Sequence, residues 1–259
     1  MIRVVVGGAT GKMGSAICRL LTKQKDMELH GAVVSRGGGN VGKRIEGGVV
    51  ALGDDQLDKA LEGADVYVDV TTPAAAEKNL IRVPPLGVNI VVGTTGISSD
   101  TMAKFAASVR RHGVSAVVTP NFSIGVNAFW KLCGEMAAVL KDYDVEIIEF
   151  HHNQKKDAPS GTAMKAAEII GEKIGINKFV KGRDGITGVR NKEIGIHSLR
   201  GGDVVGEHTV VFAGNRERLE LTHRAHSRDA FAEGALAAIR WIWQRKDGKI
   251  HTMSEVLGL

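Results

Sequence analysis

The sequence is poor in cysteine and in long apolar runs, and both shortages exclude whole classes of protein. Its 259 residues include two cysteines, Cys18 and Cys133, without Cys-x-x-Cys spacing, which argues against a disulfide framework and is typical of a reducing compartment. No stretch approaches the roughly 18 apolar residues of a membrane-spanning helix. The start, MIRVVVGGATG, has no charged region followed by a long apolar run. We therefore expect a cytoplasmic chain with no membrane segment.

Aromatic residues are also scarce, and this bears on the meaning of the positive charge. The formal net charge is +5 and the isoelectric point is near 9.2, values that are compatible with nucleic-acid binding. However, the basic residues are scattered, and the two tyrosines and seven phenylalanines are not interleaved with them as base stacking requires. We expect no nucleic-acid partner. A positive field that attracts small anionic molecules explains the charge better.

The densest group of chemically versatile residues lies in one loop, residues 149–163, with the sequence EFHHNQKKDAPSGTA. Residues 144–150 before it have the pattern of a strand. Residues 162–174 carry apolar side chains at helical spacing, and Gly175 is the expected helix stop. The loop therefore leads from a strand end to a helix start. Its two histidines and two lysines indicate a site for an anionic substrate.

The start of the predicted helix is the expected anchor for that anion. Ser160 is the expected N-cap, which leaves the backbone N–H groups of Gly161 and Thr162 at the positive end of the helix. This position favours a carboxylate or a phosphate. Lys155 and His152 add charge and hydrogen-bond donors from the same loop.

Plainer interpretations of this loop exist. Ser160 could serve only as a cap, and adjacent histidines are sometimes no more than loop surface. A zinc site is weaker still, because zinc ligands usually come from separated positions such as His-x-x-x-His, and the two cysteines lie far away in sequence. The convergence of all these groups favours the anion site, and we predict no metal.

The N-terminus carries a second signal. Residues 2–6 (IRVVV) form an apolar strand pattern, and Gly8, Gly11 and Gly14 follow before a helix-like stretch at residues 15–21. This is a Gly-x-x-Gly-x-x-Gly variant of the dinucleotide fingerprint, with a tight turn, close approach to pyrophosphate and close packing of helix on strand. A nucleoside-triphosphate loop would need Ser or Thr after its Gly-Lys pair, and methionine stands there instead.

The end of the next predicted strand, residues 29–34, bears on cofactor choice. A fold of this kind that prefers NAD commonly carries an acid there to hold the ribose hydroxyls, but the sequence continues with Ser35 and Arg36. Ser35 removes a repulsion, and Arg36 and Lys12 can pair with a 2′-phosphate. We predict a preference for NADPH over NADH.

Three further apolar runs, at residues 66–70, 88–92 and 114–118, alternate with Ala-rich or amphipathic stretches. This alternation predicts a parallel sheet with helices on both faces. Each run is followed by a polar loop: Thr71-Thr72-Pro73, Gly93-Thr94-Thr95-Gly96 and Thr119-Pro120-Asn121-Phe122-Ser123. Ligands of open α/β sheets bind outside the carboxyl ends of the strands, so these loops are candidates to hold the nicotinamide and its ribose.

The second half of the chain has a different pattern. A helix is expected at residues 126–140, and strands are expected at residues 193–199, 204–213 and 218–225. The pairs Gly201-Gly202 and Gly214-Asn215 suggest an antiparallel meander. A last helix at residues 229–245 is apolar over a broad face.

The overall expectation is an α/β protein of two domains. The first is a Rossmann-like dinucleotide-binding domain at residues 1–122, to which residues 232–259 return. The second, at residues 123–231, is an α+β domain with a mostly antiparallel sheet that serves substrate binding and oligomerisation.

Taken together, these stretches resemble dihydrodipicolinate reductases, enzymes of the lysine and diaminopimelate pathway, over almost the entire chain. The motifs that carry the resemblance are residues 8–14 (GATGKMG), 68–73 (VDVTTP), 93–96 (GTTG), 120–127 (PNFSIGVN), 149–163 (EFHHNQKKDAPSGTA), 200–212 (RGGDVVGEHTVVF) and the final VLGL. Two positions depart from the family pattern. Ser35 replaces an acid that many members carry, and Val70 replaces the Phe of the usual Asp-Phe-Thr.

The resemblance implies a role for each part of the site. His151 and Lys155 occupy the catalytic positions, and His152, Gly161 and Thr162 occupy the substrate-binding positions. The cofactor positions fall on Gly8, Ala9, Thr10, Gly11, Lys12, Met13, Arg36, Gly93, Thr94, Thr95, Thr119, Pro120, Asn121 and Phe122. The family also implies a homotetramer formed through the sheet of the second domain.

The reaction implied by the resemblance is the reduction of 4-hydroxy-tetrahydrodipicolinate, a cyclic dicarboxylate, to tetrahydrodipicolinate with NADPH or NADH and loss of water. Hydride addition to the conjugated imine leaves negative charge toward the ring nitrogen. Lys155 is therefore the expected general acid, and His151 the other acid/base or charge-stabilising group. Two alternatives stay open: another NADPH-dependent reductase of a small imine or carbonyl acid, and a non-catalytic NADP-sensing protein.

Overall fold

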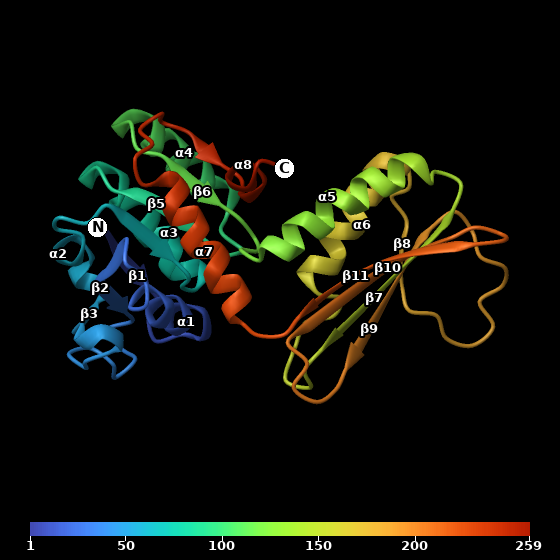
Figure 1. The fold of residues 1–259 in the computed structure, drawn as a ribbon, viewed down its shortest axis with the longest axis horizontal. Helices are drawn as coiled ribbons and strands as arrows, with labels where there is room; N and C mark the ends of the chain where they lie inside the picture. Colours follow the sequence, from blue (N-terminus) through green and yellow to red (C-terminus); the bar gives the residue numbers. More distant parts are fainter. The chain divides into compact units, whose positions relative to one another are not determined.

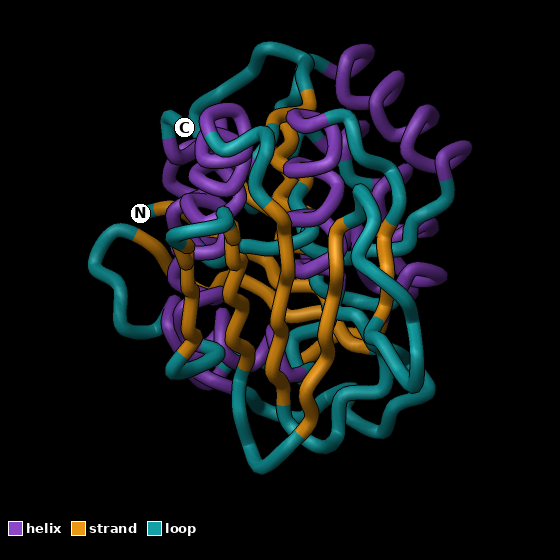
Figure 2. The backbone as a smooth tube through the Cα atoms, turned by 90° about the vertical axis from the view of Figure 1, so that its right-hand side faces the viewer, coloured by secondary structure: helices purple, strands orange, loops and turns teal.

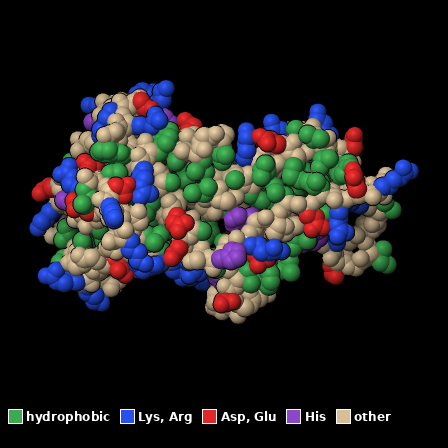
Figure 3. All heavy atoms as spheres, in the orientation of Figure 1, with side chains coloured by type: hydrophobic (Ala, Val, Ile, Leu, Met, Phe, Trp, Pro, Cys, Tyr) green, Lys and Arg blue, Asp and Glu red, His purple; other side chains and the backbone are tan.

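The computed structural model describes residues 1–259, which divide into two compact units. The first unit comprises Met1–Ser123 and Arg228–Leu259, and the second comprises Ile124–Ser227 (Figure 1). None of the helices combines the length and apolar character needed to cross a membrane. On the face shown in Figure 3, Lys and Arg side chains are interspersed with Asp and Glu and do not gather in one patch.

The first unit is built on a seven-stranded sheet in which every registered pair of strands is parallel. The strands are β1 (Ile2–Gly7), β2 (Met27–Val34), β3 (Ala51–Gly53), β4 (Val66–Asp69), β5 (Asn89–Val92), β6 (Ala116–Val118) and β12 (Ile250–His251), in the order β12-β6-β5-β4-β1-β2-β3. The predicted Rossmann-like α/β fold is confirmed.

Alternating residues of the central strand explain why both faces of this sheet are covered. Val4 and Val6 belong to one apolar core, and Val5 between them belongs to the other. The helices of the unit are α1 (Lys12–Leu21), α2 (Leu57–Ala60), α3 (Pro73–Arg82), α4 (Ser99–His112), α7 (Asp229–Ile242) and α8 (Met253–Leu257), with short 3₁₀ turns at Glu46–Gly48, Asp54–Gln56 and Pro84–Leu86. The first core includes residues of α1, α7 and α8, and the second includes residues of α2, α3 and α4.

The end of the chain is an integral part of the first unit. Helix α7 crosses in front of the sheet in Figure 1, and an Arg19–Asp229 ion pair of 2.6 Å joins its first turn to α1. Asn89 of β5 donates to the carbonyl of Ile242 at the end of α7, at 2.7 Å. Strand β12 then extends the sheet beside β6. The short β12 and α8 were not foreseen from the sequence.

The second unit places two helices, α5 (Ile124–Val139) and α6 (Gly161–Ile174), on one face of a five-stranded sheet. Its strands are β7 (Asp144–His151), β8 (Phe179–Lys181), β9 (Ile194–Arg200), β10 (Gly206–Ala213) and β11 (Arg218–Ala225), in the order β11-β10-β7-β9-β8. Figure 2 shows these strands running side by side. Val145 and Ile147 of β7 pack in the core under the helices, so Glu149 and His151, two and four residues further on, point to the same face.

The prediction that this sheet is a mostly antiparallel meander is wrong, because the sheet is mixed. Strand β10 is antiparallel to both β7 and β11, but β9 is parallel to both β7 and β8. Gly214-Asn215 does join neighbouring strands, β10 and β11. Gly201-Gly202 joins β9 to β10, and β7 lies between those two strands. A glycine pair signals a local turn, whereas β9 lies between β7 and β8, the two strands that α6 connects.

Candidate active site

The turn after β1 depends on two glycines. Gly8 has a φ of +79°, and an added Cβ there would lie 2.6 Å from the carbonyl oxygen of Val70. An added Cβ on Gly14 would lie 2.1 Å from the Gly8 carbonyl oxygen, so glycine is required for the close packing of α1 on the turn. Helix α1 begins at Lys12, three residues before the predicted start at residue 15. Its positive end therefore lies directly at the turn.

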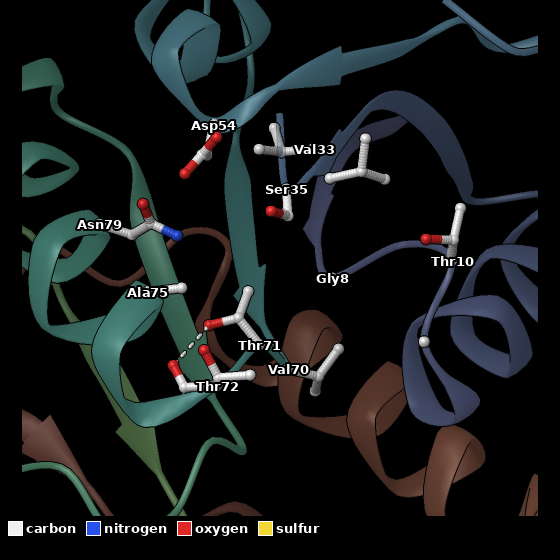
Figure 4. A pocket seen from close by; sticks show the side chains of 12 residues that line it. Gly8, Thr10, Val33, Ser35, Asp54, Val70, Thr71, Thr72, Ala75 and Asn79 are labelled. Carbon is white, nitrogen blue, oxygen red and sulfur yellow. Dashed lines mark hydrogen bonds between the residues drawn. The ribbon is translucent and has the colours of Figure 1, made fainter. Parts of the chain in front are cut away.

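A pocket of about 430 Å³ opens at this turn (Figure 4). It is lined by Gly8, Thr10, Gly11, Val33, Val34, Ser35, Asp54, Val70, Thr71, Thr72, Ala75 and Asn79. Of the predicted cofactor residues, the pocket lining includes the glycines at positions 8 and 11 together with Thr10. Ala9 is buried, Met13 packs partly against the core, and Lys12 and Arg36 are exposed. The glycine cradle and the helix start fit the pyrophosphate of a dinucleotide.

Asp69 links the polar loops that follow β4 and β5. It is fully buried, and its Oδ1 accepts hydrogen bonds from the hydroxyls of Thr71 at 2.7 Å and Thr94 at 2.6 Å. The Tyr67 hydroxyl donates to Oδ2 at 2.9 Å. Burial, followed by the charge of Asp69, raises the pKa of Tyr67 well above its usual value, so this donor keeps its proton. A single carboxylate thus fixes the positions of both loops.

The loop after β6 joins the same edge of the sheet. The backbone N–H of Thr119 donates to the carbonyl of Val92 at 3.0 Å. The ring of Phe122 lies under Gly93, where an added Cβ would be 2.3 Å from the ring. Thr119 also donates from its hydroxyl to the carbonyl of Asn121 at 2.8 Å. The predicted residues Gly93, Thr94, Thr119, Asn121 and Phe122 are therefore brought together, and Thr95 and Pro120 lie exposed beside them.

In the second unit, Glu149 is the centre of a buried ionic cluster. Its Oε2 accepts from His151 Nδ1 at 2.6 Å, and Arg200 donates to both carboxylate oxygens at 2.8 Å. The backbone N–H of Ser160 donates to Oε1 at 3.1 Å. Burial by itself would raise the pKa of Glu149, but the hydrogen bonds from His151, Arg200 and Ser198 outweigh it and hold that pKa well below its usual range. The carboxylate is therefore ionised at neutral pH.

The contact with Glu149 determines what His151 can do. A carboxylate accepts hydrogen bonds only, so the proton on the His151 ring lies on Nδ1, and Nε2 is the atom left to exchange a proton. An added Cβ on Gly206 would lie 3.0 Å from that Nε2. Glycine at this position leaves room beside the exchanging atom.

Lys155 lies on the loop that follows β7. Its Nζ is 2.9 Å from both carboxylate oxygens of Asp157, and its side chain is 20% exposed. The next residue, Lys156, is exposed and forms no ion pair. His152 is half buried, and its backbone N–H donates to the carbonyl of Val204 at 2.7 Å. The two predicted catalytic side chains thus come from one strand end and the loop directly after it.

Helix α6 starts as predicted, with a side-chain cap from Ser160. The Ser160 Oγ accepts from the Ala163 N–H at 3.2 Å and is 3.0 Å from His208 Nε2. Burial, and then the nearby His151, lower the pKa of His208 to about 3, so it is neutral at physiological pH. Gly161 lies exposed at the first helical position, and Trp130 Nε1 donates to the carbonyl of Thr162 at 3.0 Å. The start of α6 is therefore firmly held in place.

Several residues of these sites were not identified from the sequence. Glu149 was within the noted run but received no role, although its spacing of two residues from His151 on a strand places both on one face. Asp69 lay within a motif noted in the sequence. A motif does not show that this carboxylate is buried or that it accepts hydrogen bonds from five donors. Arg200 and His208 reach the site from β9 and β10, far away in sequence. Asp54 follows a strand of three residues, which is too short to give a pattern.

The parallel sheet, its glycine-rich first turn and the His-Lys cluster of the second unit define the class of NAD(P)-dependent oxidoreductases with a Rossmann-like domain. Residues 2–122 match the family described as "Dihydrodipicolinate reductase, N-terminus", and residues 125–257 match "Dihydrodipicolinate reductase, C-terminus". The chain belongs to the dihydrodipicolinate reductase family.

Individual relatives agree with this assignment. The chain is 47% identical to the 4-hydroxy-tetrahydrodipicolinate reductase of Methanothermobacter thermautotrophicus, with all of both chains covered. It is 49% identical to that of Methanocaldococcus jannaschii, covering 100% of this chain and 98% of the relative. The solved structure of dipicolinate-bound dihydrodipicolinate reductase from Paenisporosarcina sp. TG-14 superimposes with a TM-score of 0.82, at 28% identity and 98% coverage of both chains.

Proposed function

We propose that the protein is a 4-hydroxy-tetrahydrodipicolinate reductase of the lysine and diaminopimelate pathway, and that the first unit binds NAD(P)H while the second binds the substrate. The observation that carries this proposal is the buried Glu149–His151 pair, 2.6 Å apart, on the strand that leads into Lys155 and the start of α6. It places an oriented imidazole, an ammonium group and a helix N-terminus within one short stretch of chain. A cyclic dicarboxylate needs this combination of groups.

The cofactor-binding part of the proposal rests on the edge of the parallel sheet. The first turn, with Gly8, Thr10 and Gly11, lines the pocket, and α1 presents its positive end to a pyrophosphate. The loops after β4, β5 and β6, held together by Asp69 and by Phe122 under Gly93, provide the surface for the nicotinamide half. Lys12 and Arg36 are exposed and form no ion pair, so their charges are available to phosphate groups.

The substrate-binding part rests on the start of α6. The N–H groups of Gly161 and Thr162 occupy its first turn, with the Thr162 hydroxyl beside them, and they suit one carboxylate of the substrate. Ser160 is already used as the cap, so it holds the turn in shape and leaves the carboxylate to its neighbours. His152, from the same loop, is assigned to the substrate as well.

The proposed chemistry assigns separate tasks to His151 and Lys155. A bound reduced nicotinamide supplies a hydride to an unsaturated ring carbon. Negative charge then develops toward the ring nitrogen, and the Lys155 ammonium stabilises it and donates the proton that completes the reduction. His151, held by Glu149, stabilises charge or exchanges a proton at Nε2. In the loss of water, the proton removed from the ring carbon beside the hydroxyl-bearing carbon balances the proton that the leaving hydroxyl takes up, and His151 is the group assigned to this exchange.

The cofactor preference is proposed to favour NADPH. Ser35 exerts no repulsion on a 2′-phosphate, and the unpaired cations Arg36 and Lys12 attract one. Comparable catalytic efficiencies with NADPH and NADH would contradict this part of the proposal.

The reductase activity is tested by following loss of reduced-nicotinamide absorbance while the upstream synthase produces the labile substrate from pyruvate and aspartate semialdehyde. Oxidation that depends on the synthase supports the proposal. Tight cofactor binding without synthase-dependent oxidation contradicts it, and would direct attention to another substrate or to a sensing role.

A homotetramer in the cytoplasm completes the proposal. The sheet face opposite α5 and α6 carries the partly exposed Ile148 and Leu199, 38% and 43% exposed, among charged side chains. Association with further copies of this chain would bury them. The two free cysteines, Cys18 and Cys133, suit a reducing compartment. Sedimentation analysis tests the assembly, and a monomer at micromolar concentration would contradict it.

A further inference from the structure

The pocket of the first unit contains a carboxylate that the sequence pattern did not reveal. Strand β3 pairs in parallel with β2, and Gly53 lies opposite Val34 in the register. Asp54, which follows β3, is therefore the neighbour of Ser35, which follows β2. Both residues line the pocket with Gly8, and Figure 4 shows their side chains close together at its edge.

Asp54 is held in a defined position from two sides. Its Oδ1 accepts a hydrogen bond from the backbone N–H of Arg36 at 3.0 Å. Its backbone carbonyl accepts from Arg82 Nη1 of α3 at 2.9 Å, while the other end of that guanidinium pairs with Asp58. The carboxylate of Asp54 itself takes part in no ion pair. Asp54 is half buried. Its second carboxylate oxygen, Oδ2, does not accept the hydrogen bond from Arg36.

The charge at this edge of the pocket is therefore mixed. Lys12 and Arg36, each the next residue in the chain after one that lines the pocket, carry positive charge without ion-pair partners, and Asp54 in the lining carries a negative charge. In a Rossmann-like fold, an acid at the end of the second strand accepts hydrogen bonds from the ribose hydroxyls of NAD and repels a 2′-phosphate. Here serine stands at that place, and the adjacent strand brings a carboxylate to the same edge of the sheet.

We propose that Asp54 is a specificity-determining residue for the cofactor. Its carboxylate accepts hydrogen bonds from the adenosine ribose of NADH and opposes the 2′-phosphate of NADPH, so that it reduces a preference for NADPH set by Arg36 and Lys12. The proposal rests on the proposed function of the first unit as the cofactor-binding unit.

The test compares two charge-neutralising variants in the full-length protein. Asp54→Asn keeps an oxygen that accepts from the Arg36 N–H and removes the charge. Asp55→Asn is the matched control, because Asp55 is the next residue, is exposed and does not line the pocket. Dissociation constants for NADPH and NADH are measured by calorimetry, together with those for adenosine 2′,5′-bisphosphate and adenosine 5′-monophosphate.

For Asp54→Asn, the affinity ratio of NADPH to NADH should rise by about tenfold, the effect of one charge-assisted hydrogen bond. The bisphosphate should gain affinity relative to the monophosphate in the same variant, and Asp55→Asn should leave both ratios unchanged. Unchanged ratios in Asp54→Asn, or equal shifts in the two variants, would overturn the proposal. Because these are binding measurements, a failure here is distinct from an absence of reductase activity in the synthase-coupled assay.

Discussion

Glu149 Oε2 and His151 Nδ1 are 2.6 Å apart, and both side chains lie on the buried face of β7. The carboxylate is ionised and also holds Arg200 and the backbone of Ser160. One residue therefore orients the imidazole, secures the turn before α6 and connects β7 to β9. Glu149 touches no substrate in this account, so we regard it as a positioning residue.

Glu149→Gln should lower kcat by about ten- to a hundredfold, because the amide cannot stabilise a cationic His151 as the carboxylate does. The dissociation constant for NADPH should change little, because Glu149 contacts His151 in the second unit and lies outside the cofactor pocket. Glu146→Gln is the matched control: Glu146 lies on the outer face of β7 and binds Arg183, Arg190 and His197 in a similar cluster. If kcat per folded molecule decreased equally in both variants, the role of Glu149 would be merely structural.

Lys155→Ala should lower kcat by about 10²- to 10⁴-fold with little change in the dissociation constant for NADPH, because the variant lacks the proton donor. Lys156→Ala provides the comparison, since Lys156 is the adjacent lysine, is exposed and has no ion-pair partner. Steady-state kinetics measure kcat of both variants, and cofactor titration measures their dissociation constants for NADPH. Near-normal kcat in Lys155→Ala would show that another group donates the proton.

Thr162→Val and His152→Ala should mainly raise KM, because each loses a group assigned to a substrate carboxylate. Dipicolinate, a planar ring with two carboxylates, serves as a probe of the same site, and its affinity should be lower for these variants than for wild type. Thr209→Val serves as a control, because the Thr209 hydroxyl pairs with Thr222 away from α6. A change in kcat alone, with KM and the affinity for the probe unaffected, would argue against carboxylate binding at the start of α6.

His208 should make the folded state sensitive to acid. Its pKa is about 3 in the folded protein and near 6.5 in the unfolded chain, so between these values the unfolded chain binds the extra proton. Stability that is present above pH 6.5 is lost as the pH falls toward 3. At pH 5 the free energy of unfolding is lower by about 2 kcal/mol on account of His208.

His208→Gln, which retains an amide near the Ser160 hydroxyl, should remove this component. The free energy of unfolding is measured with urea at pH 7.5 and pH 5.0 for both proteins. It should fall less between the two pH values in the variant than in the wild type. Glu149, His151 and His223 also face His208 and are unchanged in both. An equal loss of stability in wild type and variant would show that His208 is not the acid-sensitive group.

The sequence predicted the first unit well, because its signals are local. The run from Ile2 through Gly14 contains strand, turn and helix start within a short span, and the parallel strands are apolar runs bounded by polar loops. The start of α6 was also predicted, with Ser160 as its cap. Each of these features depends on neighbours in the chain.

The features that were missed depend on residues distant in sequence. The position of β9 beside β7 follows from a crossover, and the Gly201-Gly202 turn says nothing about it. Arg200 reaches Glu149 only because β7 and β9 are paired. Asp54 reaches the edge of the pocket because β3 pairs with β2, and that pairing places a carboxylate beside Ser35. Local pattern cannot report such pairings.

The most direct test of the central claim is transfer of isotope from the cofactor to the substrate ring. NADPH carrying deuterium at the transferable position of nicotinamide C4 is supplied with the synthase-generated substrate, and the ring product is analysed by mass spectrometry and NMR. The account predicts one deuterium on a ring carbon of tetrahydrodipicolinate with wild-type protein and a strongly reduced rate with Lys155→Ala. Cofactor oxidation with no deuterium in that product would contradict it.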